Sequence, residues 1–318
     1  MEKIRYKIYS SYLKNKYKEK VYRIPINLPV TCPNRDGNLG KGGCTFCADV
    51  GTGFESLSNS MTVKNQLEQN IEYIGKKYKA KKFIAYFQNF TNTYLPISEF
   101  EAFIKDSIRE DVVEVSISTR PDAINKSYLD VLKEIKIREG VEITIELGLQ
   151  SINHKTLKKI NRGHTLAEFI EAVNLIKTYD FEVVAHMILN LPYDDEDDVI
   201  EGAKILSALK VDGVKLHSLY IVKNTVMGDD YLKGELDLKD VSDYVKKTAL
   251  FLGYLNPQIV IHRIVGRAPK EDSLFCNYGI SWWKIRDMIE EYMDEQEIVQ
   301  GSYFNYLGGS ALKKLNNL

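Results

Sequence analysis

The stretch Cys32-Pro-Asn-Arg-Asp-Gly-Asn-Leu-Gly-Lys-Gly-Gly-Cys44-Thr-Phe-Cys47 carries three of the four cysteines in this 318-residue chain. The spacing is C-x11-C-x2-C, and the stretch directly follows an apolar, strand-like run over residues 21–31. Three thiolates on one loop can ligate three irons of a [4Fe–4S] cluster and leave the fourth iron open to a small molecule. The Asp36-Gly37 turn signal and the glycines that follow it permit a backbone that wraps a cluster. The stretch therefore predicts a reactive cluster site.

Two other uses of these cysteines stay open on the residues alone. Cys44-x-x-Cys47 is also half of a zinc knuckle, and a four-ligand zinc site would need Cys276 or a histidine such as His262. Zinc knuckles usually pair two short-spaced halves, and the second half is missing here. A redox C-x-x-C site is less favoured, because such motifs open a helix without a third upstream cysteine. Cys276 itself is interpreted as a free buried thiol.

The composition is that of an ordinary globular protein and argues against several classes. Apolar residues make up 44% and charged residues 27%, and the net charge of −1 carries no overall nucleic-acid signature. No run approaches the length of a membrane span, and the N-terminus lacks the apolar segment of a secretory signal. Clustered cysteines do not look like a disulfide framework. We therefore expect no membrane association and a cytoplasmic location.

Residues 1–23 are locally basic. Eight lysines and arginines stand there against only Glu2 and Glu19, and five tyrosines interleave with them. Such a segment can grip a phosphate backbone and stack on bases. A solvated helix face is the simpler interpretation, and the sequence alone favours it slightly.

Strand-like, β-branched runs alternate with amphipathic helical stretches along most of the chain. The strand-like runs cover residues 21–31, 82–88, 112–119, 141–149, 182–189, 213–222 and 258–265. Helical periodicity covers residues 63–78, 98–109, 127–138, 165–178, 197–209 and 239–253. Single helices between strands imply parallel pairing through right-handed crossovers. The pattern predicts an α/β fold, a partial parallel (β/α)6-type TIM barrel, with a doubly wound sheet as the alternative.

We expect one domain with short extensions, because no linker or internal repeat divides the chain. Residues 1–20 are predicted as a basic N-terminal extension, residues 21–265 as the barrel and residues 266–318 as a C-terminal extension. The last of these contains one expected helix, from Trp282 to Tyr292.

Polar residues stand where the predicted strands end. They are Gln88, Asn89, Ser118, Gln150, His186, Lys215 and His217. The chemistry of a parallel α/β barrel gathers in the loops after the carboxyl ends of its strands, and the cysteine loop is one of those loops. Polar groups inside apolar strands cost desolvation unless they are used. The pattern predicts one polar site at that end of the barrel.

Several motifs together resemble the radical S-adenosylmethionine (SAM) superfamily. They are the cysteine loop after the first strand, Phe46 before the last cysteine, Ser118-Thr-Arg-Pro-Asp122, Glu146-Leu-Gly-Leu-Gln-Ser151 and Asn161-Arg-Gly-His164. The commonest cysteine motif of that superfamily is CxxxCxxC. The longer first gap here resembles instead the branch that contains the catalytic subunit of Elongator and its bacterial relatives. The resemblance covers roughly residues 20–265 and extends to a group of small proteins of the same length.

The resemblance implies a [4Fe–4S] cluster on Cys32, Cys44 and Cys47 with SAM at its open iron. Reductive cleavage of SAM would give methionine and a 5′-deoxyadenosyl radical that abstracts hydrogen from the substrate. The SAM contacts implied are Phe46 near the adenine, Gln88 and Asn89 towards the methionine amino group, Ser118, Gln150 at the ribose, Arg162 at the methionine carboxylate and His186. Gln88 and Asn89 depart from the family's usual Gly-Gly-Glu-like sequence, and His186 replaces a ribose-binding aspartate. Lys215, His217, Arg263 and Arg267 are candidates for substrate contact.

The leading hypothesis is a radical SAM enzyme that acts on tRNA. Elongator-type enzymes modify wobble uridine at carbon 5, and relatives of the small family are linked to remodelling 5-aminomethyl-type side chains on that base. The resemblance also implies flavodoxin or ferredoxin as the electron donor. The alternatives are a radical SAM enzyme that acts on a small metabolite and a zinc-stabilised RNA-binding module.

Overall fold

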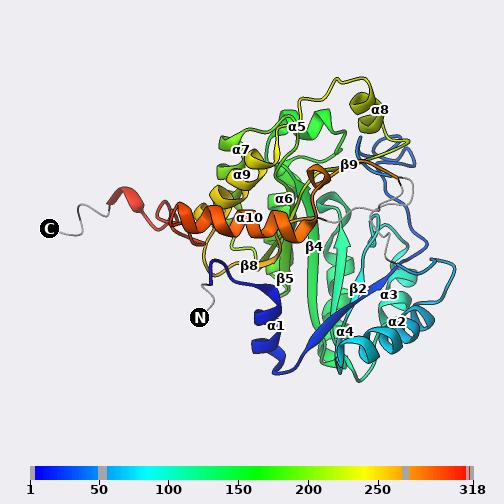
Figure 1. The fold of residues 1–318 in the computed structure, drawn as a ribbon. Coiled ribbons are helices and arrows are strands. Elements are labelled where there is room, and N and C mark those ends of the chain that lie inside the picture. The colour runs from blue at the N-terminus through cyan, green and yellow to red at the C-terminus, as the bar shows by residue number, and fades with distance from the viewer. Residues whose placement is uncertain (1–3, 49–55, 267–271, 313–314, 316–318) are drawn as a thin grey trace.

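A curved sheet of parallel strands forms the centre of the molecule (Figure 1). The computed structural model describes residues 4–48, 56–266, 272–312 and 315. The strand order is β1-β2-β3-β4-β5-β6-β8, and every neighbouring pair in this sheet is parallel. These strands are β1 (Val21–Ile26), β2 (Lys82–Phe87), β3 (Val112–Thr119), β4 (Glu142–Gln150), β5 (Glu182–Ile188), β6 (Gly213–His217) and β8 (Val260–Arg263). The predicted partial parallel barrel is confirmed.

Helices connect successive strands and cover the outer face of the sheet (Figure 1). The helices on this face are α2 (Val63–Tyr78), α3 (Ile97–Asp106), α4 (Lys126–Glu139), α6 (Leu166–Lys177), α7 (Glu196–Ala208) and α9 (Val241–Tyr254). Two short helices, α5 (His154–Lys159) and α8 (Val226–Leu232), lie instead at the carboxyl end of the strands (Figure 1). Two short 3₁₀ turns, η1 (Pro121–Ala123) and η2 (Asn277–Gly279), lie beside the carboxyl ends of the strands, and a third is η3 (Ser310–Leu312). None of the helices in the described ranges is both long and apolar enough to cross a bilayer.

The strands alternate between an apolar outer face and a polar inner face. In β4, Ile143, Ile145 and Leu147 belong to the main hydrophobic core, whereas Thr144 and Glu146 point the other way and make side-chain hydrogen bonds. Successive side chains of a strand point to opposite faces, so the outer set packs under the helices and the inner set lines the barrel. Parallel strands buried on both faces usually read as continuous apolar runs. The polar inner face therefore marks an interior that serves a purpose other than packing.

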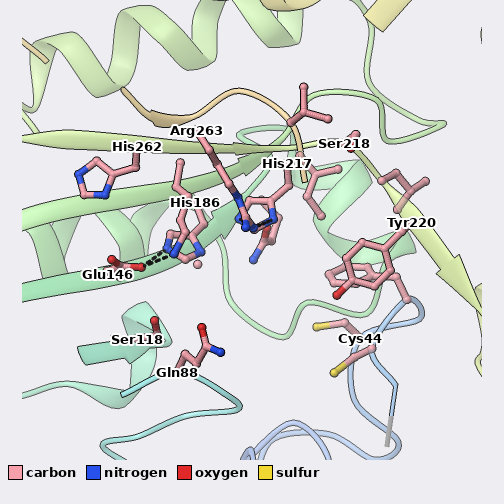
Figure 2. A pocket seen from close by; sticks show the side chains of 18 of the residues that line it. Cys44, Gln88, Ser118, Glu146, His186, His217, Ser218, Tyr220, His262 and Arg263 are labelled. Atoms are coloured by element: carbon pink, nitrogen blue, oxygen red, sulfur yellow. Dashed lines mark hydrogen bonds and ion pairs between the residues drawn. The ribbon is translucent and has the colours of Figure 1, made fainter. Parts of the chain in front are cut away.

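The strand predicted over residues 213–222 is in fact two strands. β6 ends at His217, and Leu219 donates its backbone N–H to Asn190 Oδ1 at 2.6 Å. β7 (Tyr220–Val222) then leaves the sheet and pairs in antiparallel fashion with β9 (Ser273–Cys276). The break brings Tyr220 to the mouth of the barrel, beside the loop that carries the cysteines (Figure 2).

The basic N-terminal segment packs onto the barrel. Helix α1 (Tyr9–Tyr17) contacts both β1 and β8, and Ile8 forms a parallel bridge with Ile261 of β8. Tyr17 donates a hydrogen bond to Glu114 at 2.7 Å, and Lys16 lies 2.7 Å from Glu182. The helix thus closes the amino-terminal end of the barrel.

This packing changes the interpretation of the basic segment. Lys14, Lys18 and Lys20 are exposed, as a solvated face requires, but Lys16 is paired with buried or half-buried carboxylates. The five tyrosines of the segment are all half-buried rather than displayed for base stacking. Within the helix, Tyr9, Tyr12 and Tyr17 are turned towards the barrel, whereas Lys14 stays in water and Lys16 is paired.

Helix α10 (Trp282–Glu295) starts where the sequence predicted and runs three residues further. It packs against α9 and lies across the front of the molecule in Figure 1. Tyr6 donates a hydrogen bond to Glu290 at 2.9 Å, and Arg5 pairs with Asp294. These contacts join α10 to the N-terminal segment beside the gap between β1 and β8.

Candidate functional site

A cavity of about 850 Å³ runs from the cysteine loop into the barrel. It is within the size range of small-molecule and cofactor sites. All predicted site residues that the structure describes line it, namely Cys32, Cys44, Phe46, Cys47, Gln88, Asn89, Ser118, Gln150, Arg162, His186, Lys215, His217 and Arg263. Figure 2 shows how side chains from β2 to β8 converge on this space, with Cys44 and Tyr220 on one side. Arg267 lies outside the described residues.

The cysteine loop is held in shape by its own backbone. Arg35 and Cys47 donate their N–H groups to the carbonyls of Cys32 and Cys44, at 2.8 and 2.9 Å. Gly43 has a φ of +83°, and a Cβ there would lie 2.9 Å from the Arg35 side chain. Only glycine adopts this conformation readily and also leaves room for that arginine. The loop therefore presents its thiols from a defined frame.

An arginine nitrogen faces each of the three thiols. Arg35 Nη1 lies 3.5 Å from Cys47 Sγ. Arg120 Nη1 lies 3.9 Å from Cys32 Sγ, and Arg162 Nη1 lies 3.5 Å from Cys44 Sγ. These three cations come from three separate loops. Cationic surroundings favour the thiolate form, which is the form that binds metal.

The donor set fits an iron–sulfur cluster better than a single ion. Within the described residues, no three histidine, cysteine or carboxylate side chains converge closely enough to hold one metal ion. A cluster needs its thiolates on different irons, so the three sulfurs must stand apart. Burial and the neighbouring Cys44 raise the pKa of the Cys47 thiol to about 11, while Arg35 acts against that rise. Metal ligation removes such thiol protons.

The partners that a zinc site would need are engaged elsewhere. The His262 ring stacks on Tyr9 with centroids 3.8 Å apart, and its Nδ1 lies 3.1 Å from Arg23. Cys276 lies on β9, forms no disulfide among the described residues and is half-buried rather than buried.

The motif Ser118-Thr-Arg-Pro-Asp122 positions Arg120. The Asp122 carboxylate accepts two hydrogen bonds from Arg120, at 2.8 and 2.7 Å. Burial alone would raise the pKa of Asp122, but the hydrogen bonds and charge of Arg120 hold it below its usual value. Arg120 also donates to the Arg162 carbonyl at 2.9 Å. A bidentate pair of this kind fixes the guanidinium plane, so Arg120 is aimed at Cys32.

The motif Asn161-Arg-Gly-His164 connects the cysteine loop to β4. Asn161 donates to the Gly43 carbonyl at 2.8 Å, and Arg162 donates to the Gly148 carbonyl at 2.6 Å. His164 Nε2 lies 3.0 Å from the same Gly148 carbonyl. Burial and the nearby Arg162 lower the pKa of His164 to about 3, so the imidazole is neutral at pH 7. The motif therefore acts as a clamp between two loops.

Arg162 has one N–H donor without a hydrogen-bond partner among the described residues. Its Nε is buried and has no partner among the described residues. A Cβ at Gly148 would stand 2.8 Å from Arg162 Nη2 and 2.9 Å from Gln150 Nε2. The absent side chain at position 148 leaves the space in which both polar groups face the cavity. This is the arrangement that the predicted role of Arg162 requires.

The other predicted SAM contacts lie around the same rim. Gln88 donates to Ser56 at 3.0 Å, and Asn89 donates to Asn27 at 3.0 Å. Asn89 and Gln150 have φ values of +91° and +76°. Strained backbone at non-glycine residues persists where the surrounding structure over-determines it, often at functional sites. A bulge between Gly148 and Gln150 re-aims the end of β4 towards the cavity.

A single buried carboxylate organises the barrel interior. Glu146 Oε1 accepts from Arg23 at 2.5 Å and from Ser116 at 3.2 Å. Its Oε2 accepts hydrogen bonds from Tyr86 at 3.0 Å and Lys215 at 3.0 Å, and lies 2.7 Å from His186 Nε2. Burial alone would raise the pKa of Glu146, but these cations hold it well below the usual value. His186 and Lys215 thus belong to one network with Glu146 at its centre.

The network shifts the protonation of its members. Burial, reinforced by the charge on Lys215, lowers the pKa of His186 to about 4. Burial lowers the pKa of Lys215 to about 7, although Glu146 opposes the shift. His186 is therefore neutral at pH 7, while Lys215 exchanges a proton in the physiological range.

Sequence reasoning missed several residues that the site brings together. Arg35, Arg120, Arg23, Tyr86 and Glu146 were not predicted as site residues. The two-residue alternation of polar side chains within β3 and β4 was the available signal for Glu146. β2 has no such alternation, so its sequence gives no comparable signal for Tyr86. No local pattern distinguishes Arg35 from a solvated loop cation.

Comparison with known proteins agrees with this geometry. The signature of the Radical SAM superfamily matches residues 27–206, and that of the Radical_SAM C-terminal domain matches residues 211–295. Protein YtqA of Bacillus subtilis, an uncharacterized protein, is 33% identical over 304 residues, which cover 95% of this chain and 94% of YtqA.

Similarity to Elongator complex protein 3 is more distant. The human protein is 30% identical over 156 residues, which cover 48% of this chain and 27% of that protein. The solved structure of archaeal Elp3 from Methanocaldococcus infernus superposes with a TM-score of 0.67 at 16% identity, covering 88% of this chain and 64% of that one. The structural likeness shows a shared fold.

Proposed function

The chain belongs to the radical SAM superfamily, and from that premise we propose that it uses a [4Fe–4S] cluster and SAM to modify the side chain of a wobble uridine in tRNA. Superfamily members use that cluster and that cofactor. When bound, the two supply a one-electron cleavage of SAM that yields a 5′-deoxyadenosyl radical, the agent that abstracts hydrogen from a substrate. The cluster ligands would be Cys32, Cys44 and Cys47.

The observation that carries the cluster assignment is the match between three thiols and three guanidinium groups at the head of one cavity. A thiolate-ligated cluster is anionic, and three cations at 3.5 to 3.9 Å from the sulfurs stabilise that charge. Hydrogen bonds to cluster sulfurs also tune the reduction potential. The three arginines would therefore stabilise the charge of a cluster and tune its potential, as residues that contact the ligands do at other metal sites.

The remaining cavity residues orient SAM and the substrate. The spare Nε of Arg162 and the space above Gly148 would receive the methionine carboxylate, since an arginine fork suits that group. Phe46 and Tyr220 line the cavity and would limit access of water, with Tyr220 beside the cysteine loop. Lys215, His217 and Arg263 lie deeper and would face the substrate.

Support for tRNA as the substrate comes from the Elongator relatives and from the residue motifs shared with that branch. Within the described part of the N-terminal basic segment, Lys14, Lys18 and Lys20 are exposed and would contact a phosphate backbone, and Lys20 also donates a hydrogen bond to the Tyr78 carbonyl at 2.9 Å. A small metabolite is the alternative substrate class. Flavodoxin or ferredoxin would be the electron donor.

The first experiment tests the chemistry. Reduced protein, reconstituted anaerobically with iron and sulfide, is incubated with SAM, and 5′-deoxyadenosine is measured. We expect its formation by the wild-type protein and its loss in Cys44→Ala. Absence of 5′-deoxyadenosine, with the two proteins indistinguishable, would overturn the enzymatic proposal, and a colourless zinc-only protein would support the RNA-binding module. Replacing the chemical reductant with reduced flavodoxin or ferredoxin tests the electron donor.

The second experiment tests the substrate. Deletion of the gene should change the profile of modified wobble uridines in tRNA nucleosides measured by mass spectrometry, and an unchanged profile would contradict a tRNA substrate. In vitro, the triple variant Lys14→Ala, Lys18→Ala, Lys20→Ala should slow turnover of tRNA. Lys16 is kept, because it pairs with Glu182 and its loss would disturb the fold. Unaltered turnover would favour a metabolite.

A further inference from the structure

An arginine without a carboxylate partner faces the interior of the cavity. Arg263 ends β8 and lines the cavity next to His217 of β6 (Figure 2). Its Nη2 contacts both ring nitrogens of His217, with Nε2 at 3.0 Å. The lone pairs of the two ring nitrogens diverge in the ring plane, so Nη2 cannot donate to both, and the guanidinium lies against the ring. Most of its N–H donors have no other partner among the described residues. Its Nε is buried and has no hydrogen-bond partner among the described residues.

Each of the other cations of the cavity is engaged. Arg35 and Arg162 face thiols, and Arg120 is paired with Asp122. Lys215 is paired with Glu146, and Arg286 on α10 is paired with Asp287. Arg263 is the one lining cation for which the described part of the chain offers neither a carboxylate nor a thiol within contact distance. A desolvated, unpaired cation is costly unless something outside the chain matches it.

The carboxylates of the cavity are not available to Arg263. Glu146 already faces five donors, and Glu290 accepts from Tyr6 and Arg5. The two nearest histidine rings supply no negative charge either, because an imidazole is neutral or cationic in this pH range. Burial lowers the pKa values of His186 and His217 and keeps both rings neutral at pH 7. Within the described residues, the surroundings of Arg263 are therefore polar, and Glu146 acts on it only at long range, without an ion pair.

We propose that Arg263, held in place by His217, is the subsite that binds an anionic group of the substrate. The guanidinium fork suits a carboxylate or a phosphate, which it binds through two parallel hydrogen bonds. This inference rests on the proposed function only for the identity of the substrate. The anion-binding subsite itself is argued from the contacts of Arg263 and His217 alone. For a nucleotide substrate, the anion is either a carboxylate on the modified base or a phosphate of the backbone.

The first test needs no RNA. Acetate and methyl phosphate are titrated into SAM-saturated holoenzyme, and their binding is followed by 13C and 31P NMR. We expect saturable binding to the wild type, weakened roughly ten- to a hundredfold in Arg263→Gln, the range of a lost charge-assisted hydrogen bond. His217→Asp should also lose anion binding, because the new carboxylate would occupy Arg263. Arg263→Lys should retain part of it.

The second test finds the source of the anion. Anticodon stem-loops carry a wobble uridine with a 5-carboxymethyl group, its neutral 5-carbamoylmethyl isostere, or a neutral methylphosphonate linkage beside that uridine. If the base carries the anion, the wild type prefers acid over amide and Arg263→Gln does not. If a backbone phosphate is the anion, only the stem-loop with the neutral methylphosphonate linkage binds the wild type more weakly. Arg138→Gln, the same change at an exposed site on α4, should leave every affinity unaltered.

The outcomes separate the two proposals. Small anions that bind to Arg263 while no stem-loop binds would contradict a tRNA substrate and leave the subsite standing. The subsite is wrong if the wild type binds no anion, if Arg263→Gln or His217→Asp binds anions as the wild type does, or if Arg263→Gln loses affinity for SAM instead. The last result would assign Arg263 to the cofactor.

Discussion

The Nη1 atom of Arg162 lies 3.5 Å from the Sγ atom of Cys44, although 118 positions separate the two residues in the sequence. The same guanidinium is anchored on the Gly148 carbonyl, so its distance from the sulfur is set by β4 rather than by a flexible side chain. A cation held at this distance favours the more negative state of whatever the thiolate ligates.

Replacement of Arg162 should therefore change the reduction potential of the reconstituted cluster. We expect Arg162→Met to lower the potential by tens of millivolts, since about 59 mV corresponds to a tenfold change in a one-electron equilibrium. The potential of Arg162→Lys should lie between those of the wild type and Arg162→Met. Potentiometric titration monitored by electron paramagnetic resonance measures the shift. Arg109→Met, at an exposed arginine paired with Asp111, is the control. An unaltered potential in Arg162→Met would contradict the assignment.

A methyl group at position 148 should disturb the cavity without unfolding the protein. The added Cβ would lie 2.8 Å from Arg162 Nη2 and 2.9 Å from Gln150 Nε2, so both side chains must shift. We expect Gly148→Ala to weaken SAM binding at least tenfold, because about one charge-assisted hydrogen bond would be lost. Equilibrium dialysis measures this affinity. Gly75→Ala is matched, because its Cβ would meet only ordinary contacts at 3.6 Å or more in α2. Equal SAM affinity in the two variants would refute the role given to this space.

Neutralising the central carboxylate should destabilise the barrel. Glu146→Gln leaves Arg23 and Lys215 buried without their anion. Removing one partner of a buried pair typically costs about 3–5 kcal/mol. We expect a loss of that order in the free energy of unfolding measured with urea. Glu171→Gln, at an exposed position of α6, should change it by less than about 0.5 kcal/mol. A Glu146→Gln protein as stable as the wild type would show that the cations are solvated.

Lys215 should titrate near neutral pH. Burial lowers its pKa from 10.5 to about 7, so between these values the unfolded chain binds a proton that the folded chain does not. The contribution to stability is therefore fully present above pH 10.5 and is lost as the pH falls through about 7. We expect a lysine 13Cε resonance with a midpoint near pH 7 that is missing from Lys215→Met. A resonance that titrates only above pH 9 would contradict the prediction.

Helix α1 should matter for stability through its tyrosines and not through its exposed lysines. Tyr17→Phe removes the hydroxyl that donates to the buried Glu114 at 2.7 Å. A hydrogen bond to a charged group contributes about 1.5–3 kcal/mol, and we expect a loss in that range by urea unfolding. Lys14→Ala, on the exposed side of the same helix, should be neutral within about 0.5 kcal/mol. Equal effects of the two changes would show that the helix does not close the barrel.

Much of the fold was predictable from local patterns. The strand-like, β-branched runs and the helical periodicity between them depend only on neighbours in sequence, and they predicted the parallel barrel. The division of residues 213–222 into β6 and β7 was not predictable, because it depends on Asn190, which meets the backbone of Leu219 only in the folded chain. Which side chains of α1 face the barrel was not predictable for a similar reason, because their partners Glu114 and Glu182 lie on strands distant in sequence.

The sequence by itself predicted the reagent of this protein, because three thiols on one short loop indicate metal–sulfur chemistry without any distant residue. It also marked the strand ends that line the cavity, because each polar residue interrupts an apolar run locally. Only the tertiary structure decided which arginine faces which thiol and which arginine faces none. Those relationships arise when the curled sheet brings separate loops to one end of the barrel. Burial there raises the free-energy cost of every charge that lacks a partner.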